Sequence, residues 1–441
     1  MLLNIEKLIY GGDGLARLPA DANGRGKAVF IPFVLAGEKI DATLTEQKPG
    51  FARARAEKIV EPSPNRTPPA CPYFILCGGC HYQHATYEHQ LEIKKEILRE
   101  NLRRIAKLEL HCDITLHASP PWNYRNRSRL QLRTQPEFAL GYFKFSSHEL
   151  LPVEQCPISS PLINRAIAAT WNLGRAGKSA EGLREMEFFA NEDDTRLLIE
   201  LSCAPEARRA DVRAWGEELR SSIPEIAGIV AFRGSQKGLA EQLVTIGAPD
   251  LTYKTKAAAY RVSAGSFFQT NRFLADELIN LVTANRSGEL ALDLYAGVGL
   301  FSTALASAFR HIVSVEMSQT SFADLSYNLP SNGKAVHAAA ERFIAALGDQ
   351  GRAKVGAILP QLRQTPELVV VDPPRSGLGD RVARSLAGLG APRLTYVSCD
   401  PATLARDLVP LRAAGYRLEE VHLIDLFPQT YHLETVVHLV R

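Results

Sequence analysis

A cysteine at the end of a buried strand is the first candidate for chemistry. The segment from Leu394 to Ser398 reads as an apolar strand, and Cys399 follows it directly before a helix start at Asp400-Pro401. A thiol at a helix N-terminus lies near the positive end of the helix dipole, which favours the nucleophilic thiolate. We therefore expect Cys399 to act as a nucleophile; a buried, inert cysteine is the simpler alternative.

Glu434 is the candidate base that such a nucleophile would need. It stands among apolar residues in the last strand region, where a water-facing edge carboxylate would explain it equally well. Chemistry gives a stronger reason. Carbon 5 of uracil is a poor nucleophile, but thiolate addition at carbon 6 produces an enolate that can attack a methyl group. A base must then remove the proton at carbon 5, and we assign that role to Glu434.

Acidic residues follow three neighbouring strands of the C-terminal half. Asp293 precedes a tight turn with Gly297 and Gly299, Glu316 ends the next strand, and Asp372 ends the third. Glycines let the backbone approach a ligand, and strand-end carboxylates can hold ribose hydroxyls in the crevice of an open sheet. A nicotinamide site is the competing interpretation, but the third small residue of its fingerprint is missing. S-adenosyl-L-methionine is therefore the expected cofactor.

Three cysteines lie close together in the first quarter of the chain. Cys71, Cys77 and Cys80 occur with two glycines before the last thiol, a pattern that lets the backbone fold round a small inorganic centre. Cys156, next to a proline, is the candidate fourth ligand. Zinc is the alternative, but it usually takes two close cysteine pairs, and only one such pair is present. We expect an iron-sulfur cluster.

A run of arginines predicts a surface for RNA. These arginines are spaced by two or four residues, so in a strand they share one face. They are Arg125, Arg127, Arg129 and Arg133. Trp122 and Tyr124 beside them could stack on unpaired bases, whereas a solvated charged strand face is the alternative. A second basic patch comprises Lys48, Arg53, Arg55, Lys58 and Arg66.

Three domains are expected to position these residues. Residues 1–60 alternate apolar stretches with glycine-rich turns, which predicts a small β-barrel. Residues 61–265 begin with a proline-rich linker and mix strands with helices, including an amphipathic helix over about 86–107. Residues 266–441 repeat helix, strand and loop, as a doubly wound parallel sheet requires. The predicted class is α/β, with a barrel and a central α+β domain added.

Composition sets broad limits on the function. The chain has 441 residues, 46% hydrophobic and 22% charged, which are ordinary globular values. No apolar run is long enough for a membrane span, and the start lacks the features of a secretory signal, so a cytoplasmic location is expected. A net charge of +3 does not by itself indicate nucleic acid. Seven cysteines are too few and odd in number for a disulfide framework.

Together these segments resemble the RumA-type 23S ribosomal RNA uracil-5-methyltransferases of the TrmA superfamily. The resemblance covers nearly the whole chain and rests on the order of four features. These are the spacing of the four cysteines, Asp372-Pro-Pro-Arg375, Ser398-Cys399-Asp400-Pro401 and His432-Leu-Glu434. Amino-directed methyltransferases often carry Asn-Pro-Pro-aromatic instead of Asp372-Pro-Pro-Arg375, and they need no thiol.

The resemblance implies an OB-like TRAM barrel, a [4Fe-4S] cluster on the four cysteines and a Rossmann-like class I methyltransferase domain. It implies contacts of S-adenosyl-L-methionine with Gln269, Tyr295, Glu316 and Asp372, and 23S rRNA as the partner. The sequence departs from many relatives at Asp400 and from some at Leu300, both of which are asparagine there. Neither departure removes a reacting group.

Three alternatives remain at this point. A tRNA uracil-5-methyltransferase is the nearest, although the simpler tRNA enzymes of the superfamily lack both barrel and cluster. A radical methylthiotransferase would need Cys-x-x-x-Cys-x-x-Cys, which is absent from the sequence. A non-catalytic RNA-binding protein would have no need of Cys399 and Glu434.

Overall fold

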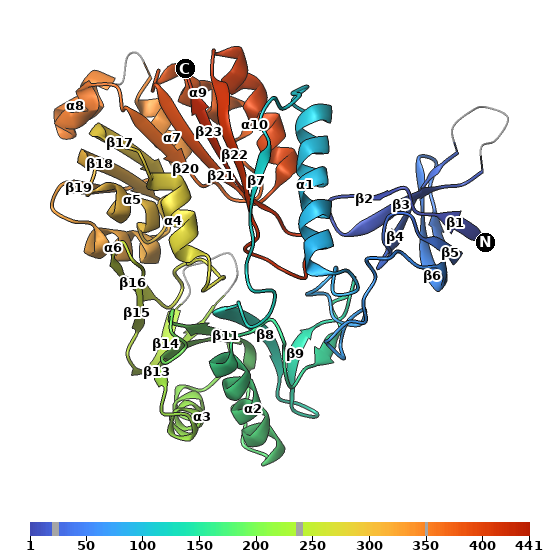
Figure 1. Ribbon diagram of the computed structural model, residues 1–441. Helices are drawn as coiled ribbons and strands as arrows, with labels where there is room; N and C mark the ends of the chain where they lie inside the picture. Colours follow the sequence, from blue (N-terminus) through green and yellow to red (C-terminus); the bar gives the residue numbers. More distant parts are fainter. Residues whose placement is uncertain (20–25, 235–240, 349–351) are drawn as a thin grey trace.

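The computed structural model describes residues 1–19, 26–234, 241–348 and 352–441. Three large sheets follow one another along the chain, and the first projects from the body that the other two form (Figure 1). Within the described residues, no helix combines the length and the apolar character that crossing a membrane would require.

The N-terminal sheet has six strands in the order β1-β5-β6-β4-β3-β2. Side chains along β5 alternate between the core and the surface, with Ile40 and Ala42 facing inward. They join a small apolar core separate from those of the other sheets. The strands are β1 (Leu2–Asn4), β2 (Lys7–Leu8), β3 (Asp13–Arg17), β4 (Ala28–Pro32), β5 (Lys39–Gln47) and β6 (Phe51–Glu61).

The central sheet has seven strands in the order β10-β9-β8-β11-β12-β13-β14. Two amphipathic helices, α2 (Pro161–Arg175) and α3 (Arg209–Ser222), share one apolar core with it. The strands are β8 (Arg127–Arg133), β9 (Ala139–Phe143), β10 (Leu150–Pro152), β11 (Leu183–Ala190), β12 (Leu197–Cys203), β13 (Ile226–Arg233) and β14 (Glu241–Gly247). The hairpin of β15 (Asp250–Lys254) and β16 (Ala259–Ser263) leads into the third sheet.

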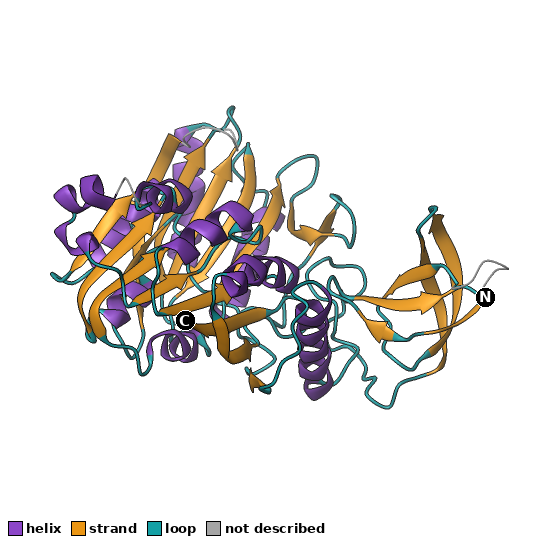
Figure 2. Ribbon diagram, turned by 90° about the horizontal axis from the view of Figure 1, so that it is seen from above, coloured by secondary structure: helices purple, strands orange, loops and turns teal. Residues whose placement is uncertain are grey.

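The third sheet has eight strands in the order β19-β18-β17-β20-β21-β23-β22-β7, with helices on both faces (Figure 2). Its central strand β20 is wholly buried, as covering on both faces requires. The strands are β17 (Gly288–Leu294), β18 (Phe309–Glu316), β19 (Gly333–His337), β20 (Leu368–Val371), β21 (Arg393–Ser398), β22 (Arg417–Ile424) and β23 (Glu434–Val440). The helices are α4 (Ala275–Thr283), α5 (Leu300–Leu305), α6 (Gln319–Asn328), α7 (Ala340–Ala346), α8 (Arg352–Ile358), the 3₁₀ turn Pro360–Arg363, α9 (Gly379–Gly388) and α10 (Pro401–Ala413). This arrangement confirms the predicted α/β fold of the C-terminal half.

The edge of the third sheet comes from an earlier part of the chain. Strand β7 (Ile114–His117) pairs in parallel with β22. The helix before it, α1 (Tyr87–Arg104), packs with its apolar side chains against α10 in the same core. Because α1 packs in the core of the third sheet and β7 forms its edge, residues 87–117 belong structurally with that sheet. The sequence predicted the helix but not strand β7.

Candidate active site

Cys399 and Glu434 lie across from each other at the end of two adjacent strands. Strands β21 and β23 are antiparallel, and Ser398 pairs with Thr435 at the end of their ladder. One step further along the same register places Cys399 opposite Glu434. Cys399 is half-buried and Glu434 is 6% exposed. The two residues assigned to the reaction are therefore neighbours, although 35 positions separate them in the sequence.

The expectation that helix α10 favours a Cys399 thiolate is wrong for the substrate-free protein. The side chain of Asp400 accepts hydrogen bonds from the first backbone N–H groups, those of Ala402 at 3.0 Å and Thr403 at 2.9 Å. A carboxylate thus satisfies the helix N-terminus. Burial first, and then the charges of Glu434 and Asp372, raise the pKa of the Cys399 thiol to about 12.

Two carboxyl groups beside the thiol, the buried Glu434 and the half-buried Asp372, have raised pKa values of their own. Burial and the neighbouring charge of Asp372 raise the pKa of Glu434 well above its usual range. Burial and the charge of Asp293 raise the pKa of Asp372 to about 7. Arg375 acts in the opposite direction on both Cys399 and Glu434. Positive charge near the site therefore favours the ionised forms of these acidic groups.

Arg375 and His432 are site residues to which the sequence analysis gave no role. The Nη2 atom of Arg375 lies 3.2 Å from Nδ1 of His432, and the Arg375 carbonyl accepts a hydrogen bond from the Thr403 hydroxyl at 3.2 Å. Arg375 thus bridges the start of α10 and the segment before Glu434. Burial and Arg375 lower the pKa of His432 to about 3, so this imidazole is neutral at neutral pH. Both residues stand inside the quoted motifs, which was the signal available in the sequence.

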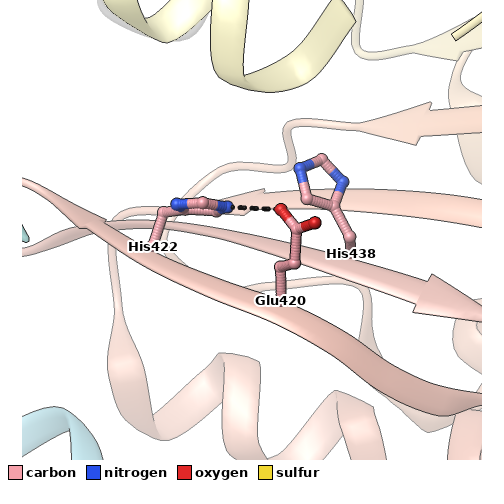
Figure 3. A group of neighbouring side chains, drawn as sticks. All are labelled: Glu420, His422 and His438. Carbon is pink, nitrogen blue, oxygen red and sulfur yellow. Dashed lines mark hydrogen bonds and ion pairs between the residues drawn. The ribbon is translucent and has the colours of Figure 1, made fainter. Parts of the chain in front are cut away.

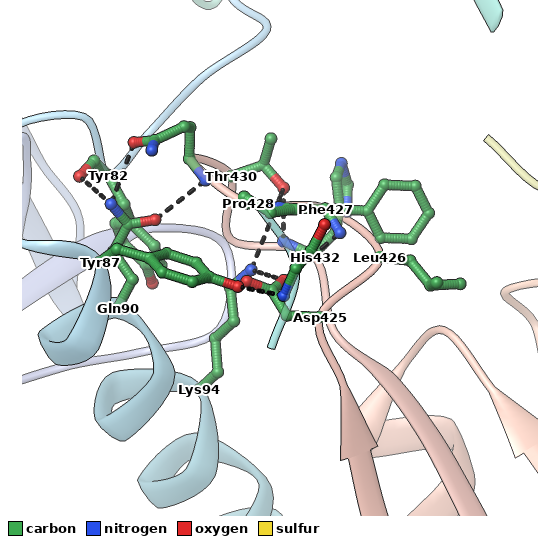
Figure 4. A network of polar contacts seen from close by, with 12 residues as sticks. Tyr82, Tyr87, Gln90, Lys94, Asp425, Leu426, Phe427, Pro428, Thr430 and His432 are labelled. Carbon is green, nitrogen blue, oxygen red and sulfur yellow. Dashed lines mark hydrogen bonds and ion pairs between the residues drawn. The ribbon is translucent and has the colours of Figure 1, made fainter. Parts of the chain in front are cut away.

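The segment between β22 and β23 is held by helix α1 (Figure 4). Lys94 and Asp425 form a fully buried ion pair of 2.6 Å, and Lys94 also donates to the Phe427 carbonyl at 2.9 Å. Gln90 and Gln429 exchange two hydrogen bonds, Nε2 to Oε1 at 3.0 Å and backbone N to Oε1 at 2.9 Å. These bonds fix the segment that carries His432 and leads into Glu434.

The predicted cofactor residues meet at the carboxyl ends of β17, β18 and β20. Parallel pairing sets Asp293 level with Ser314 and Val370 on the neighbouring strands. The backbone N–H of Gly297 donates to Glu316 at 2.9 Å, and the N–H of Asp372 donates to the Leu294 carbonyl at 3.4 Å. The turn after β17 and the ends of the other two strands thus lie side by side, at the place where open α/β sheets bind their ligands in a crevice.

The turn after β17 needs its glycines. Tyr295, Gly297 and Gly299 have φ values of 62°, 56° and 93°, in the left-handed region. A Cβ on Gly299 would lie 2.9 Å from the Leu325 side chain, whereas one on Gly297 would meet no protein atom within 4 Å. Gly297 therefore opens toward free space, as close approach of a ligand requires.

The other predicted cofactor residues differ in how accessible they are. Asp293 is fully buried, hydrogen-bonded to Ser302, and burial raises its pKa to about 7. It lies under the turn rather than in the crevice. The Tyr295 hydroxyl donates to Glu341 at 2.9 Å. Gln269 lies between β16 and α4 and is 8% exposed.

All four predicted metal ligands line one cavity of about 240 Å³. They are Cys71, Cys77, Cys80 and Cys156. The backbone positions them: Cys71 N donates to Gln83 at 3.1 Å, and Cys156 N donates to Asn164 at 2.8 Å. Burial raises the pKa of the Cys77 thiol to about 11, and the charges of Cys156 and Cys71 add to this effect. A shared cation would remove that repulsion.

The predicted arginine stripe is divided between two environments. Arg125 precedes strand β8, lines the cysteine cavity and has an Nε atom that is buried without a hydrogen-bond partner among the described residues. Arg127 donates to the Ser266 carbonyl at 2.6 Å and lies over the Phe189 ring. Arg129 pairs with Glu187 at 2.8 Å, and Arg133 donates to the Glu137 carbonyl at 3.4 Å. Arg125 and Arg127 therefore face protein, and only Arg129 and Arg133 are exposed.

Four of the five residues of the second basic patch line a groove of about 940 Å³ between the barrel and the cysteine loop, and Lys48 is not among its lining residues. Its basic residues are Arg53, Arg55, Lys58 and Arg66. Aromatic residues line the same groove, namely Tyr10, Phe30, Phe33, Phe145 and Tyr431. Cations with interleaved aromatic rings suit a single-stranded nucleic acid.

A polar cluster that the sequence analysis did not predict lies further along β22 and β23 (Figure 3). His422 contacts Glu420 at 3.0 Å and His117 on β7 at 3.2 Å, and His438 lies beside them. In the described part of the chain, this is the one group of three metal-ligating side chains whose ligand atoms come within 4.8 Å of one another. Burial and the charge of Arg286 lower the pKa of His438 to about 4. The contacts connect the edge strand β7 to β22.

Comparisons with known proteins agree with this geometry. The family model described as tRNA (uracil-5-)-methyltransferase matches residues 86–441, and the TRAM domain model matches residues 1–56. An uncharacterized RNA methyltransferase of Aquifex aeolicus is 31% identical, covering 99% of this chain and 97% of the relative. One from Thermosynechococcus vestitus is 30% identical over the same shares.

Among solved structures, the Pyrococcus abyssi tRNA (uracil-54, C5)-methyltransferase in complex with S-adenosyl-L-homocysteine has a TM-score of 0.74 at 23% identity. The match covers 100% of both chains, so the two proteins share their fold throughout. The family model spans more than half of the sequence and includes both reacting residues. The chain belongs to the tRNA (uracil-5-)-methyltransferase family of RNA-modifying enzymes and carries a TRAM domain at its N-terminus.

Proposed function

We propose that this protein transfers a methyl group from S-adenosyl-L-methionine to carbon 5 of a uridine in RNA, through a covalent adduct of Cys399 at carbon 6. The observation that carries the proposal is the opposition of Cys399 and Glu434 across β21 and β23, with Asp372 close enough to perturb both. A non-catalytic RNA-binding protein would have no reason to gather a half-buried thiol, a half-buried carboxyl group and a buried one at one place.

The proposed steps balance on these residues. The Cys399 thiol releases its proton to solvent and its sulfur bonds to carbon 6, while the carbon 5–carbon 6 π electrons shift to form an enolate. Carbon 5 then takes the methyl group. The Glu434 carboxylate accepts the proton from carbon 5, and Cys399 leaves as a thiolate to restore the ring. Uridine and S-adenosyl-L-methionine become 5-methyluridine, S-adenosyl-L-homocysteine and a proton.

The raised pKa values indicate that substrate binding activates the site. In the substrate-free protein the pKa values of the Cys399 thiol and of the Glu434 carboxyl are both raised, mainly by burial, which disfavours the thiolate and the carboxylate that the reaction needs. S-adenosyl-L-methionine supplies an electrophilic methyl group and a positive sulfonium. A nearby positive charge favours the ionised forms of Asp372, Glu434 and Cys399 together. This dependence would restrict reactive thiolate to the complete complex.

The crevice at the ends of β17, β18 and β20 fits the cofactor. Glu316 keeps further acceptor capacity after accepting the N–H groups of Gly297 and Ser318, so it can accept ribose hydroxyls. Asp372 lies between the crevice and Cys399 and suits the positive end of the cofactor. The family resemblance assigns Tyr295 and Gln269 to cofactor binding. Asp293 is buried below the turn and supports it through its hydrogen bond with Ser302.

The cysteine cavity fits a [4Fe-4S] cluster better than zinc. A zinc–sulfur distance of about 2.3 Å would bring tetrahedral sulfurs to about 3.8 Å from one another. No three of the four sulfurs lie within 4.8 Å of one another in the described ranges. A cubane cluster spreads its thiolates over separate irons, and the unpartnered Arg125 Nε would face its negative charge. Iron and sulfide analysis of anaerobically purified protein tests this; zinc without iron would contradict it.

The RNA class is a choice between two candidates. The family resemblance makes 23S rRNA the first, with the groove between barrel and cysteine loop as its binding surface. Transfer RNA is the second, because the P. abyssi protein named as a tRNA methyltransferase shares the fold over the full length. The presence of the barrel thus does not separate the two classes.

One assay tests both reaction and substrate. Purified protein is incubated with methyl-labelled S-adenosyl-L-methionine and unmodified 23S rRNA or tRNA transcripts, and labelled nucleosides are identified by mass spectrometry. We expect label in 5-methyluridine of one RNA class and none with Cys399→Ala. Glu434→Gln should accumulate a covalent protein–RNA species, because the methylated adduct cannot lose its proton. Label in another nucleoside, or a fully active Cys399→Ala, would refute the mechanism.

A further inference from the structure

A tyrosine of the N-terminal barrel reaches the proposed nucleophile. Tyr10 lies in the turn between β2 and β3, and its hydroxyl donates a hydrogen bond of 3.1 Å to the backbone carbonyl of Cys399. The two residues are 389 positions apart in the sequence. Burial and the charge of Asp400 raise the pKa of Tyr10 above its usual value, so the hydroxyl remains a donor.

The carbonyl that Tyr10 holds belongs to the peptide between Cys399 and Asp400. On the other side of this peptide, the Asp400 N–H donates to the Ser398 hydroxyl at 3.3 Å, and the Asp400 side chain caps α10. Together with these two contacts, the hydrogen bond from the Tyr10 hydroxyl holds the turn in one conformation. Because the Cβ–Sγ bond of Cys399 starts from this turn, the orientation of the peptide determines where the sulfur points.

Tyr10 also contacts the side of the site that carries the base. The Tyr10 ring packs edge-on against the Tyr431 ring, with 5.4 Å between the ring centroids. The Tyr431 ring in turn contacts the His432 ring, with 4.2 Å between the ring centroids. His432 is two residues before Glu434 in the sequence. One side chain of the barrel therefore contacts both Cys399 and the segment that leads to Glu434.

The same side chain lines the groove of about 940 Å³, together with Arg53, Arg55 and Lys58. The turn that bears it packs closely on the cysteine loop, since a Cβ on Gly12 would lie 3.1 Å from the His81 ring. An RNA strand in this groove would contact Tyr10 and its supporting barrel directly.

We propose that Tyr10 is a positioning residue through which RNA bound at the barrel sets the orientation of Cys399. This inference rests on the proposed uridine methylation. It predicts that loss of the Tyr10 hydroxyl slows attack by the thiol without weakening the binding of RNA or of cofactor.

Tyr10→Phe removes only the donor and keeps the ring against Tyr431. Tyr416→Phe is the matched control, because the Tyr416 hydroxyl likewise donates to a backbone carbonyl, that of Ala391, outside the site. Adduct formation is followed in single turnovers with saturating RNA that carries 5-fluorouridine, which blocks the final proton removal. Loss of one hydrogen bond is expected to slow adduct formation about five- to tenfold in Tyr10→Phe.

The control is expected to react at the wild-type rate, and the KM for RNA and the melting temperature of Tyr10→Phe should stay at wild-type values. An adduct rate of Tyr10→Phe within twofold of wild type, or an equal loss in both variants, would overturn the role of Tyr10. If wild-type protein produces no 5-methyluridine in any RNA, the proposed function itself fails. The two failures are thereby distinguishable.

Discussion

The reactivity of Cys399 toward a simple alkylating agent tests the electrostatics of the empty site. Iodoacetamide reacts with thiolates, so its rate reports the ionised fraction of each cysteine. An ordinary cysteine with a pKa of about 8.5 is about one-tenth ionised at pH 7.5. With a pKa of about 12, Cys399 has a thiolate fraction of about 3 in 100,000 at that pH. The ionised fractions differ by about 3,000-fold.

The alkylation rates should differ less than the ionised fractions do, because a more basic thiolate is a stronger nucleophile. With a Brønsted coefficient of about 0.4 to 0.5, the gain is about 25- to 55-fold. Cys399 should therefore alkylate about 55- to 120-fold more slowly than an ordinary cysteine. The exposed Cys112 provides a reference within the same chain.

The assay quenches samples over time and measures the peptides that contain Cys399 and Cys112 by mass spectrometry. The rate at Cys399 should still rise about tenfold per pH unit at pH 9.5, because its pKa is not yet reached. Alkylation of Cys399 as fast as that of Cys112, or a plateau below pH 9, would refute the conclusion that burial and the neighbouring carboxyl groups suppress the thiolate.

Three further outcomes follow from the described contacts. The pKa of Asp372 is about 7, so its ionised fraction grows about tenfold between pH 6 and pH 8; cofactor affinity measured by calorimetry should rise over this range, and Asp372→Asn should abolish the rise. Lys94→Met leaves Asp425 buried without its partner, a loss of about 3–5 kcal/mol seen as a lower melting temperature; the double variant with Asp425→Leu should regain much of it, and no regain would contradict the pairing. Arg125→Gln should lower the retention of iron while RNA affinity stays unchanged; the reverse result would return Arg125 to the RNA surface.

The sequence predicted those site residues whose role depends on local chemistry. Cys399 and Glu434 each end or begin a strand, and apolar runs with turn residues mark such positions without knowledge of the fold. The strand-end carboxylates Glu316 and Asp372 were found in the same way. Parallel strands bring their carboxyl ends to one edge, so the crevice follows from the order of the elements.

The remaining features depend on tertiary contacts that no local pattern encodes. The arginine spacing predicted one continuous strand face, but β8 begins at Arg127, and Arg125 instead bridges Ser159 and Asn271 outside the strand. Tyr10 and strand β7 find their partners several hundred residues away. The depressed reactivity expected for Cys399 likewise arises from burial and from the charges of Glu434 and Asp372, which only the folded chain brings about.

The order of synthesis gives strand β7 a further significance. Residues 114–117 occupy the edge of a sheet whose adjoining strands, β22 and β23, lie within the last 25 residues of the chain. During translation β7 and helix α1 therefore emerge long before the surface on which they pack. Contacts of such sequence separation form slowly and leave apolar surface exposed until they close. The sheet, and with it the position of Glu434, can be completed only after strands β22 and β23 have been synthesised.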